Sequence, residues 1–463
     1  MNPEKVLLKA KNVGFDKLVP QSSIQTEADV EKYRTQGYAF VITDGEFKQH
    51  FPGIDSSNIY YTSSLSVDSI YFNRRTLAAC SFNIPFLMLD VHAGKNRIPT
   101  LLKAIKECET DVAHWKFSSS LSALTDTMRM EYFELLFERY PDISEKVPDL
   151  FRLFFSYYFI SDYGFNKLSS TTMEKILAAK RPEDQAEIDK QLENLPETLT
   201  VYRGGSNDVS TSPSEAYSWT IDAKTASFFA CRLGNDGAYI AKTAVLKKDI
   251  INCCLDGREK EVIVVPHNVK IEEIIQLKGQ KDCSDIIPAV QKIYLEHLNL
   301  LDELKFKMKS DIHGGAHEAR VMLLTLSIAY YLKLPKSDQR VLAMAAIYHD
   351  TMRDNDGEDA QHGYYAADYY KSNEERIDPL VAFIIEYHCR PDEDGYARIQ
   401  SDRALSKNRT RSKLLFDVFK DADALDRIRF GFHDLDFTRL RLPVSKTLLN
   451  ISKVYLEQVR YEH

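Results

Sequence analysis

Residues 337–350 read SDQRVLAMAAIYHD. The apolar side chains of this stretch recur at the spacing of one helical face; they are Val341, Leu342, Ala345 and Ala346. Ser337 precedes them as a candidate N-cap. The pattern predicts a helix that buries one stripe and ends on the polar pair His349-Asp350. Such a pair beside a buried helix is well placed to build an enclosed polar site.

More histidines and aspartates lie beside apolar helical runs in the same region. They are His313, His317, His362, His388, Asp423 and His433. Neutral imidazoles and carboxylates are suitable ligands for hydrolytic divalent ions such as zinc, manganese, iron or magnesium. We therefore expect a buried metal site. His313 lies one turn before His317, where capping or packing near the site is the simpler expectation.

The order of these residues resembles the HD superfamily of metal-dependent phosphohydrolases. The matching features are a histidine three residues before Arg320-Val321, the His349-Asp350 pair, and Asp423 in an Ala-Asp-Ala-Leu setting. The resemblance implies an all-α domain, which we place at residues 286–463. It also implies two divalent ions, with Mn, Fe, Mg, Zn and Ni not distinguished. The implied ligands are His317, His349, Asp350 and Asp423 for one ion, and His362 and His388, with Asp350 bridging, for the other.

Three arginines beside the expected ligands are candidates for contacts to substrate phosphate. They are Arg320, Arg353 and Arg390. A guanidinium group presents paired donors that match phosphate oxygens. Asp350 is also the acidic residue that we expect to act in catalysis, because a bridging carboxylate lies next to both ions and the water they activate.

A second group of polar residues lies in a strand-rich segment. Arg203 ends the strand-like run Thr200-Val201-Tyr202, and the motif Ser218-Trp219-Thr220 begins another strand. Glu259 and Glu261 precede a β-branched run, and a strand would point both to one side. These residues resemble the arginine–serine–glutamate signature of mono-ADP-ribosyltransferases, although Ser-Trp-Thr stands where that family commonly has Ser-Thr-Ser.

The second resemblance implies a split β-sandwich with preceding helices, which we place at residues 121–285, and NAD as the substrate. Arg203 would support the NAD phosphates, while Ser218 and Thr220 would brace the nicotinamide end. Breaking the nicotinamide–ribose bond develops positive charge on the ribose, which the carboxylate of Glu261 would stabilise. Glu259 would orient or deprotonate the acceptor.

The sequence pattern of the remaining N-terminal region, residues 1–120, predicts a small α/β unit of unknown role. Its strand-like runs are Ala39–Ile42 and Phe86–Leu89, and Asp44-Gly45 is typical of a turn. Residues 121–198 follow helical spacing, with Ser169 or Ser170 as a helix cap. The fold class expected for the whole chain is therefore multidomain α+β.

Bulk composition limits the expected cellular location and the classes of partner. The 463 residues carry a net charge of -8, which argues against a large nucleic-acid-binding surface. Seven scattered cysteines without a CxxC pair indicate reduced thiols, hence a cytoplasmic protein or an effector delivered into a host cytosol. The aromatic-rich run Leu150–Ile160 contains Arg152 and is too short for a membrane span, so we expect no membrane partner.

These observations lead to a bifunctional enzyme as the main hypothesis. One site transfers ADP-ribose from NAD to an acceptor, which could be a protein or a nucleic acid. The other hydrolyses a phosphate ester or phosphodiester in a nucleotide or an ADP-ribosylated substrate. Two alternatives stay open. The transferase-like region could be a degenerate binding module beside an active nucleotide phosphohydrolase, or the chain could be a toxin or effector whose HD domain only binds a partner or a regulatory nucleotide.

Overall fold

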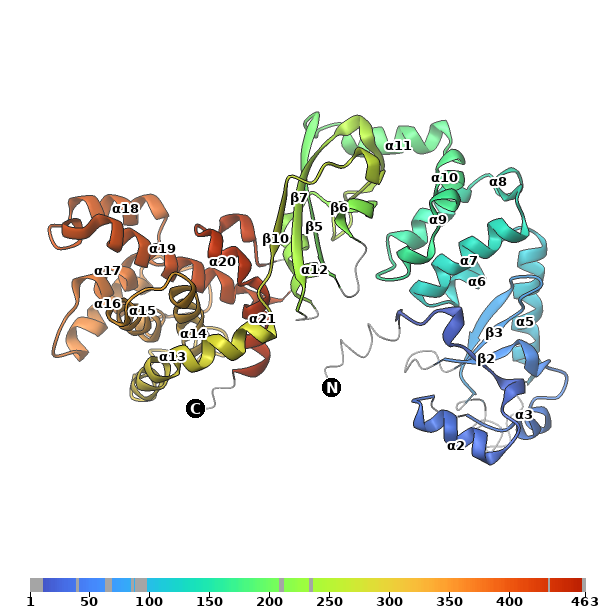
Figure 1. The fold of residues 1–463 in the computed structure, drawn as a ribbon, viewed down its shortest axis with the longest axis horizontal. Coiled ribbons are helices and arrows are strands. Elements are labelled where there is room, and N and C mark those ends of the chain that lie inside the picture. Colours follow the sequence, from blue (N-terminus) through green and yellow to red (C-terminus); the bar gives the residue numbers. More distant parts are fainter. Residues whose placement is uncertain are drawn as a thin grey trace. The chain divides into compact units, whose positions relative to one another are not determined.

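The computed structural model describes residues 11–38, 41–62, 69–84, 87, 98–207, 212–232, 236–431 and 434–459. The chain forms two compact units, Met1–Glu193 and Asn194–His463 (Figure 1). The helices over residues 121–193, which the sequence groups with the transferase-like strands, belong to the first unit. The mixed α+β class is confirmed, with strands in both units.

The first unit contains a four-stranded antiparallel sheet in the order β1-β2-β3-β4. Its strands are β1 (Val19–Pro20), β2 (Ile59–Tyr61), β3 (Ser69–Phe72) and β4 (Ala79–Phe82). Helices α2 (Glu27–Thr35), α3 (Asp44–His50) and α5 (Ile98–Ala113) accompany the sheet.

The expected strands and turn of this unit need correction. Val41 and Ile42 lie in irregular backbone, while Ala39-Phe40 and most of Phe86–Leu89 fall outside the described residues. Asp44-Gly45 forms the first turn of α3 instead of a β-turn. The physical reason is a capping box, in which the Thr43 hydroxyl accepts from the Glu46 amide and the Glu46 carboxylate accepts from the Thr43 amide.

Six further helices of the first unit lie within its described residues. They are α6 (Ser118–Ser122), α7 (Asp126–Arg139), α8 (Ile143–Lys146), α9 (Leu150–Tyr158), α10 (Ser170–Ala178) and α11 (Pro182–Leu192). Ser169 caps α10 by accepting from the Thr172 amide at 3.1 Å. The rings of Phe133 and Phe154 meet edge to face, so the aromatic run of α9 belongs to the core. In the described part of the chain, no helix combines the length and apolar character needed to cross a membrane.

The second unit begins with a six-stranded antiparallel sheet in the order β10-β7-β5-β6-β9-β8. The strands are β5 (Thr198–Ser206), β6 (Ser218–Thr220), β7 (Ala238–Leu246), β8 (Ile250–Cys254), β9 (Glu261–Val264) and β10 (Glu273–Gln276). The pairing of β5 with β6 consists of Tyr202 opposite Thr220 among the described residues. A split β-sandwich stays a prediction.

Helix α12 (Ala223–Cys231) packs directly on β5. A Cβ at Gly204 would lie 1.9 Å from the carbonyl oxygen of Ala226 and 2.7 Å from the amide nitrogen of Ala230. Glycine is therefore required at this position by the close approach of helix and strand, and not by loop flexibility.

The rest of the second unit is helical, which confirms the expected all-α C-terminal region (Figure 1). Its helices are α13 (Gln280–Leu301), α14 (Gly315–Tyr331), α15 (Lys336–Tyr348), α16 (His362–Asn373), α17 (Pro379–Tyr387), α18 (Asp392–Ser401), α19 (Arg409–Asp426), α20 (Pro443–Thr447) and α21 (Leu449–Gln458). Helix α14 is buried on all sides from His317 to Ala329 and packs against α13, α15 and α19. It forms the centre of the bundle.

Two details of packing matter for the site. Helix α15 starts at Lys336 after Pro335, whose extended backbone (φ -64°, ψ 157°) leads into it, so Ser337 is not the N-cap. Helix α12 contacts α21, and Ala226 and Ala230 share one continuous apolar core with the helical bundle. Sheet and bundle are thus joined by buried side chains.

Candidate metal centre and a second polar site

Helix ends deliver four of the expected metal ligands to one buried place. His349 and Asp350 directly follow α15, His388 directly follows α17, and His362 begins α16. Helix ends leave backbone carbonyls without intrahelical partners. The Nδ1–H of His349 donates to the carbonyl of Ala346 at 2.8 Å, and that of His388 donates to Ile385 at 2.7 Å. Each bond fixes the orientation of the ring and leaves the lone pair of Nε2 available to a ligand.

The first cluster of donors surrounds His317. Its Nε2 lies 3.1 Å from Nε2 of His349, 3.4 Å from Oδ1 of Asp423 and 3.6 Å from Oδ2 of Asp350. Together with Asp350, these residues are the set that the sequence assigned to one ion. His313 also belongs here, because its Nδ1 lies 2.8 Å from Oδ2 of Asp350. The structure therefore places His313 at the centre itself.

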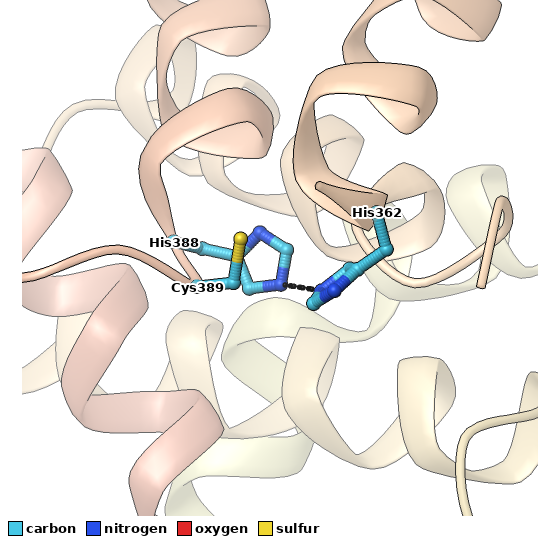
Figure 2. A group of neighbouring side chains, drawn as sticks. All are labelled: His362, His388 and Cys389. Atoms are coloured by element: carbon cyan, nitrogen blue, oxygen red, sulfur yellow. Dashed lines mark hydrogen bonds between the residues drawn. The ribbon is translucent and has the colours of Figure 1, made fainter. Parts of the chain in front are cut away.

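The second cluster gathers on the other oxygen of Asp350. Oδ1 lies 3.0 Å from Nε2 of His362 and 3.4 Å from Nε2 of His388. The two rings come from different helices and point at each other with Nε2 atoms 2.9 Å apart (Figure 2). Cys389 lies beside them and offers its thiol as a further donor, which the sequence reasoning did not consider.

The donor set fits divalent cations. In the pairs His317–His349 and His362–His388 the two Nε2 atoms face each other. The Nδ1–H groups of His349 and His388 are bonded to backbone carbonyls, so the Nε2 lone pairs of these two rings are available to a metal ion. With metal–nitrogen bonds of 2.0–2.1 Å, two adjacent ligands of an octahedral ion lie about 3 Å apart, which matches these separations. Burial lowers the pKa of His349 to about 3, so the ring is neutral. Burial opposes ionisation of Asp350, yet the surrounding histidines hold its pKa well below the usual range.

A buried acidic residue orients His317 from behind. The Nδ1–H of His317 donates to Oδ2 of Asp426 at 2.7 Å. Asp426 in turn accepts two bonds from the guanidinium of Arg320, at 2.7 and 3.0 Å. Arg320 is buried and committed to Asp426. Its phosphate-facing role stays a prediction, while its positioning role is visible.

The other two arginines differ in their surroundings. Arg353 is buried, with Nη1 3.5 Å from Oδ1 of Asp350 and 3.3 Å from Nε2 of His362. Arg390 is partly exposed, lies over the ring of Tyr387 and is 3.9 Å from Glu386. Arg353 is thus the predicted arginine that reaches the second cluster of donors.

Two buried residues at the centre were not identified from the sequence. Arg429 places Nη1 3.4 Å from Asp426 and Nη2 3.4 Å from Nδ1 of His313. Glu318 is fully buried, and both of its carboxylate oxygens lack a hydrogen-bond partner among the described residues. Burial and the nearby charge of Asp350 raise its pKa well above the usual value, which favours the protonated carboxyl group. Its position directly after His317 was the available signal.

The second polar site lies on three neighbouring strands of the sheet. Arg203 on β5 donates from Nη1 to the Ser218 carbonyl at 2.8 Å, and the Ser218 hydroxyl donates to Oε1 of Glu261. Glu261 is buried, and this burial raises its pKa to about 8, with the charge of Glu259 adding to the shift. The arginine, serine and glutamate of the predicted signature therefore meet in space. Nε of Arg203 is buried without a hydrogen-bond partner among the described residues.

Glu259 and Thr220 are arranged differently from the sequence expectation. Strand β9 starts at Glu261, and Lys260 adopts a left-handed backbone with φ of 44°. Glu259 therefore belongs to a turn, and the two-residue period of a strand does not relate it to Glu261. The Thr220 hydroxyl donates to the Glu259 carbonyl at 2.6 Å, so Thr220 holds this turn.

The helical scaffold thus brings together histidine and aspartate side chains that could hold divalent metal ions. Residues 314–428 match the family model of the HD domain. This match includes every predicted metal ligand and leaves the sheet and the first unit unassigned. No curated protein and no solved structure matches the chain.

Proposed function

We propose that the centre around Asp350 is a two-ion site that hydrolyses a phosphate monoester or phosphodiester. The observation that carries the proposal is the division of the Asp350 carboxylate between two clusters. Oδ2 faces His317 and His313, whereas Oδ1 faces His362 and His388. A carboxylate shared in this way is the geometry by which one aspartate bridges two ions.

Divalent ions supply a nucleophilic water of lowered pKa and neutralise phosphoryl charge when they are bound. The protein residues hold and orient the ligands. Asp426 fixes the ring of His317, and Arg320 fixes Asp426. Arg353 and Arg429 bring two buried positive charges to the edge of the centre, where a phosphate oxygen could accept from them.

Hydrolysis is tested with bis-p-nitrophenyl phosphate and p-nitrophenyl phosphate in the presence of Mn, Mg, Zn, Fe or Ni. Release of nitrophenolate should require added metal and be abolished in Asp350→Asn. Asp434→Asn serves as a control, because that carboxylate pairs with the exposed Arg427 at 3.1 Å. A protein that binds metal but releases no product would favour the effector alternative, in which the domain binds a partner or a regulatory nucleotide. Absence of bound metal would contradict the proposal that these residues form a metal centre.

For the sheet we propose NAD-dependent mono-ADP-ribosyl transfer. The supporting observation is the chain of contacts from Arg203 through Ser218 to Glu261 across β5, β6 and β9. Arg203 would meet the NAD pyrophosphate, and ionised Glu261 would stabilise positive charge on the ribose as the nicotinamide bond breaks. Glu259, from its turn, would reach the acceptor.

Transfer is tested by nicotinamide release from NAD, with and without chelator. Glu261→Gln should lose release at least a hundredfold, because a neutral amide cannot stabilise the developing cation. Chelator should leave nicotinamide release unchanged, because none of the predicted metal ligands lies in the sheet. Absence of nicotinamide release in the wild type would favour a degenerate nucleotide-binding module instead.

The presence of both sites on one chain supports related substrates. We propose that the phosphohydrolase acts on a nucleotide or on an ADP-ribosylated product, with a protein or nucleic acid as the acceptor of transfer. Each of the variants Glu261→Gln and Asp350→Asn should retain one of the two activities, and a comparison of the substrates that each variant still converts tests this relation. Unrelated substrates in the two variants would oppose it.

A further inference from the structure

A cavity lies between α12 and the C-terminal end of the helical bundle, beside the place where the two are in contact. Its volume is about 180 Å³. Lys224 and Arg232 line it from the side of α12, and Arg429 and Lys453 line it from the side of the bundle. Neither the predicted transferase residues nor the predicted metal ligands line it, and the residue that it shares with the surroundings of the metal centre is Arg429.

The lining of this cavity is strongly cationic. It contains four basic side chains, and none of its described lining residues is acidic. Two of the four have acidic partners outside the lining, because Lys453 lies 3.6 Å from Glu457 and Arg429 lies 3.4 Å from Asp426. The side chain of Arg429 is only 8% exposed, and its Nε has no hydrogen-bond partner among the described residues. A buried cationic donor of this kind calls for an acceptor.

The remaining walls specify more than a charge. Phe228 and Ile428 add apolar surface to the lining. A volume of about 180 Å³ is below the 300–1,000 Å³ typical of sites for larger ligands. The cavity therefore suits a small molecule that carries both a phosphate and a flat or apolar part, and it is too small for a dinucleotide such as NAD.

We propose that this cavity binds a nucleoside monophosphate or a similarly sized sugar phosphate, and that Arg429 couples its occupancy to the metal centre. Arg429 lines the cavity and at the same time contacts Asp426 and His313. A phosphate that attracts this guanidinium weakens its contact with Asp426, the residue that orients His317. The site is regulatory and goes beyond the two proposed activities.

Binding is tested by calorimetric titration of the full chain with AMP. Wild type should bind one AMP per chain, whereas adenosine, which lacks the phosphate, should not bind measurably. Lys224→Ala and Lys453→Ala should each weaken AMP binding about tenfold, because each removes a cation from the cavity. Arg427→Ala is the matched control: Arg427 lies on the same short helix as Arg429 but is exposed and pairs with Asp434. Equal affinities in all four proteins would overturn the proposal.

Two further titrations separate this cavity from the other sites. AMP binding should persist in chelator-treated protein and in Arg203→Ala, and loss in either would place the nucleotide at the metal centre or the transferase site and overturn the proposal. Linkage requires AMP and metal to change each other's affinity by the same factor. An unchanged metal affinity at saturating AMP would overturn the coupling through Arg429.

Discussion

Asp426 holds His317 by accepting its Nδ1–H at 2.7 Å, and this bond decides which nitrogen of His317 faces the metal centre. Both side chains are buried, and Arg320 keeps Asp426 in place from the other side. A ligand and its support thus come from opposite ends of the domain sequence, from α14 and α19.

Replacing Asp426 by Asn should weaken metal binding about 10- to 100-fold, because an amide cannot hold the imidazole as a carboxylate does. Metal affinity is measured by competition with a chromophoric chelator. Asp434→Asn provides the control at an aspartate of the same segment. Unchanged metal affinity in Asp426→Asn would contradict the orienting role.

Metal stoichiometry should distinguish the two clusters. Mass spectrometry of the purified protein should find two ions in wild type and one in His388→Ala, because Nε2 of His388 lies 3.4 Å from Oδ1 of Asp350, the oxygen that faces the second cluster. Asp350→Asn should lose both ions, since it removes the shared carboxylate. One ion in wild type would oppose the bridged arrangement.

Nicotinamide release should rise with pH up to about 8. Glu261 must be ionised to stabilise the ribose cation, and its pKa is raised to about 8 mainly by burial. Below this pKa, kcat/KM for NAD should fall about tenfold per pH unit, because kcat/KM reports ionisations of the free enzyme. The Ser218 hydroxyl lowers this pKa, so Ser218→Ala should shift the profile to higher pH. A flat profile between pH 6 and 9 would contradict this role of Glu261.

Glu318 should make the metal-free protein less stable as pH rises. Its folded-state pKa is raised by burial and by Asp350, so the folded chain retains a proton that the unfolded chain releases. Stability is therefore greatest below the unfolded pKa of about 4.3 and falls as pH increases through the range up to the folded value. Thermal melting of chelator-treated protein should show Glu318→Gln more stable than wild type at pH 8, with a smaller difference at pH 5. An equal difference at both pH values would contradict a buried, protonated Glu318.

Gly204→Ala should destabilise the second unit by about 1–3 kcal/mol or prevent its folding, because the new Cβ would overlap the backbone of α12. Urea unfolding measures the effect. Gly45→Ala is the control, since its Cβ would meet only the Thr43 hydroxyl at 3.9 Å. Similar stabilities for the two variants would show that α12 can move away from β5 without loss.

The sequence by itself determined the helical bundle and the identity of most candidate ligands. Apolar spacing in 337–350 predicts α15, and the histidines and aspartates near helix ends need only the bundle to bring them together. It also identified Arg203, Ser218 and Glu261, because their order resembles the arginine–serine–glutamate signature, although Arg203 lies inside β5 and does not end the strand as expected.

Only the tertiary structure decided the relations between distant elements. Arg429 and Glu318 look like ordinary surface charges in the sequence, yet packing of α14 against α19 and the following turn buries both at the centre. The left-handed Lys260 removes Glu259 from the strand, which residue spacing could not reveal. The cationic cavity depends on α12 meeting α21, a contact between segments more than two hundred residues apart whose register is set by side-chain packing and not by local pattern.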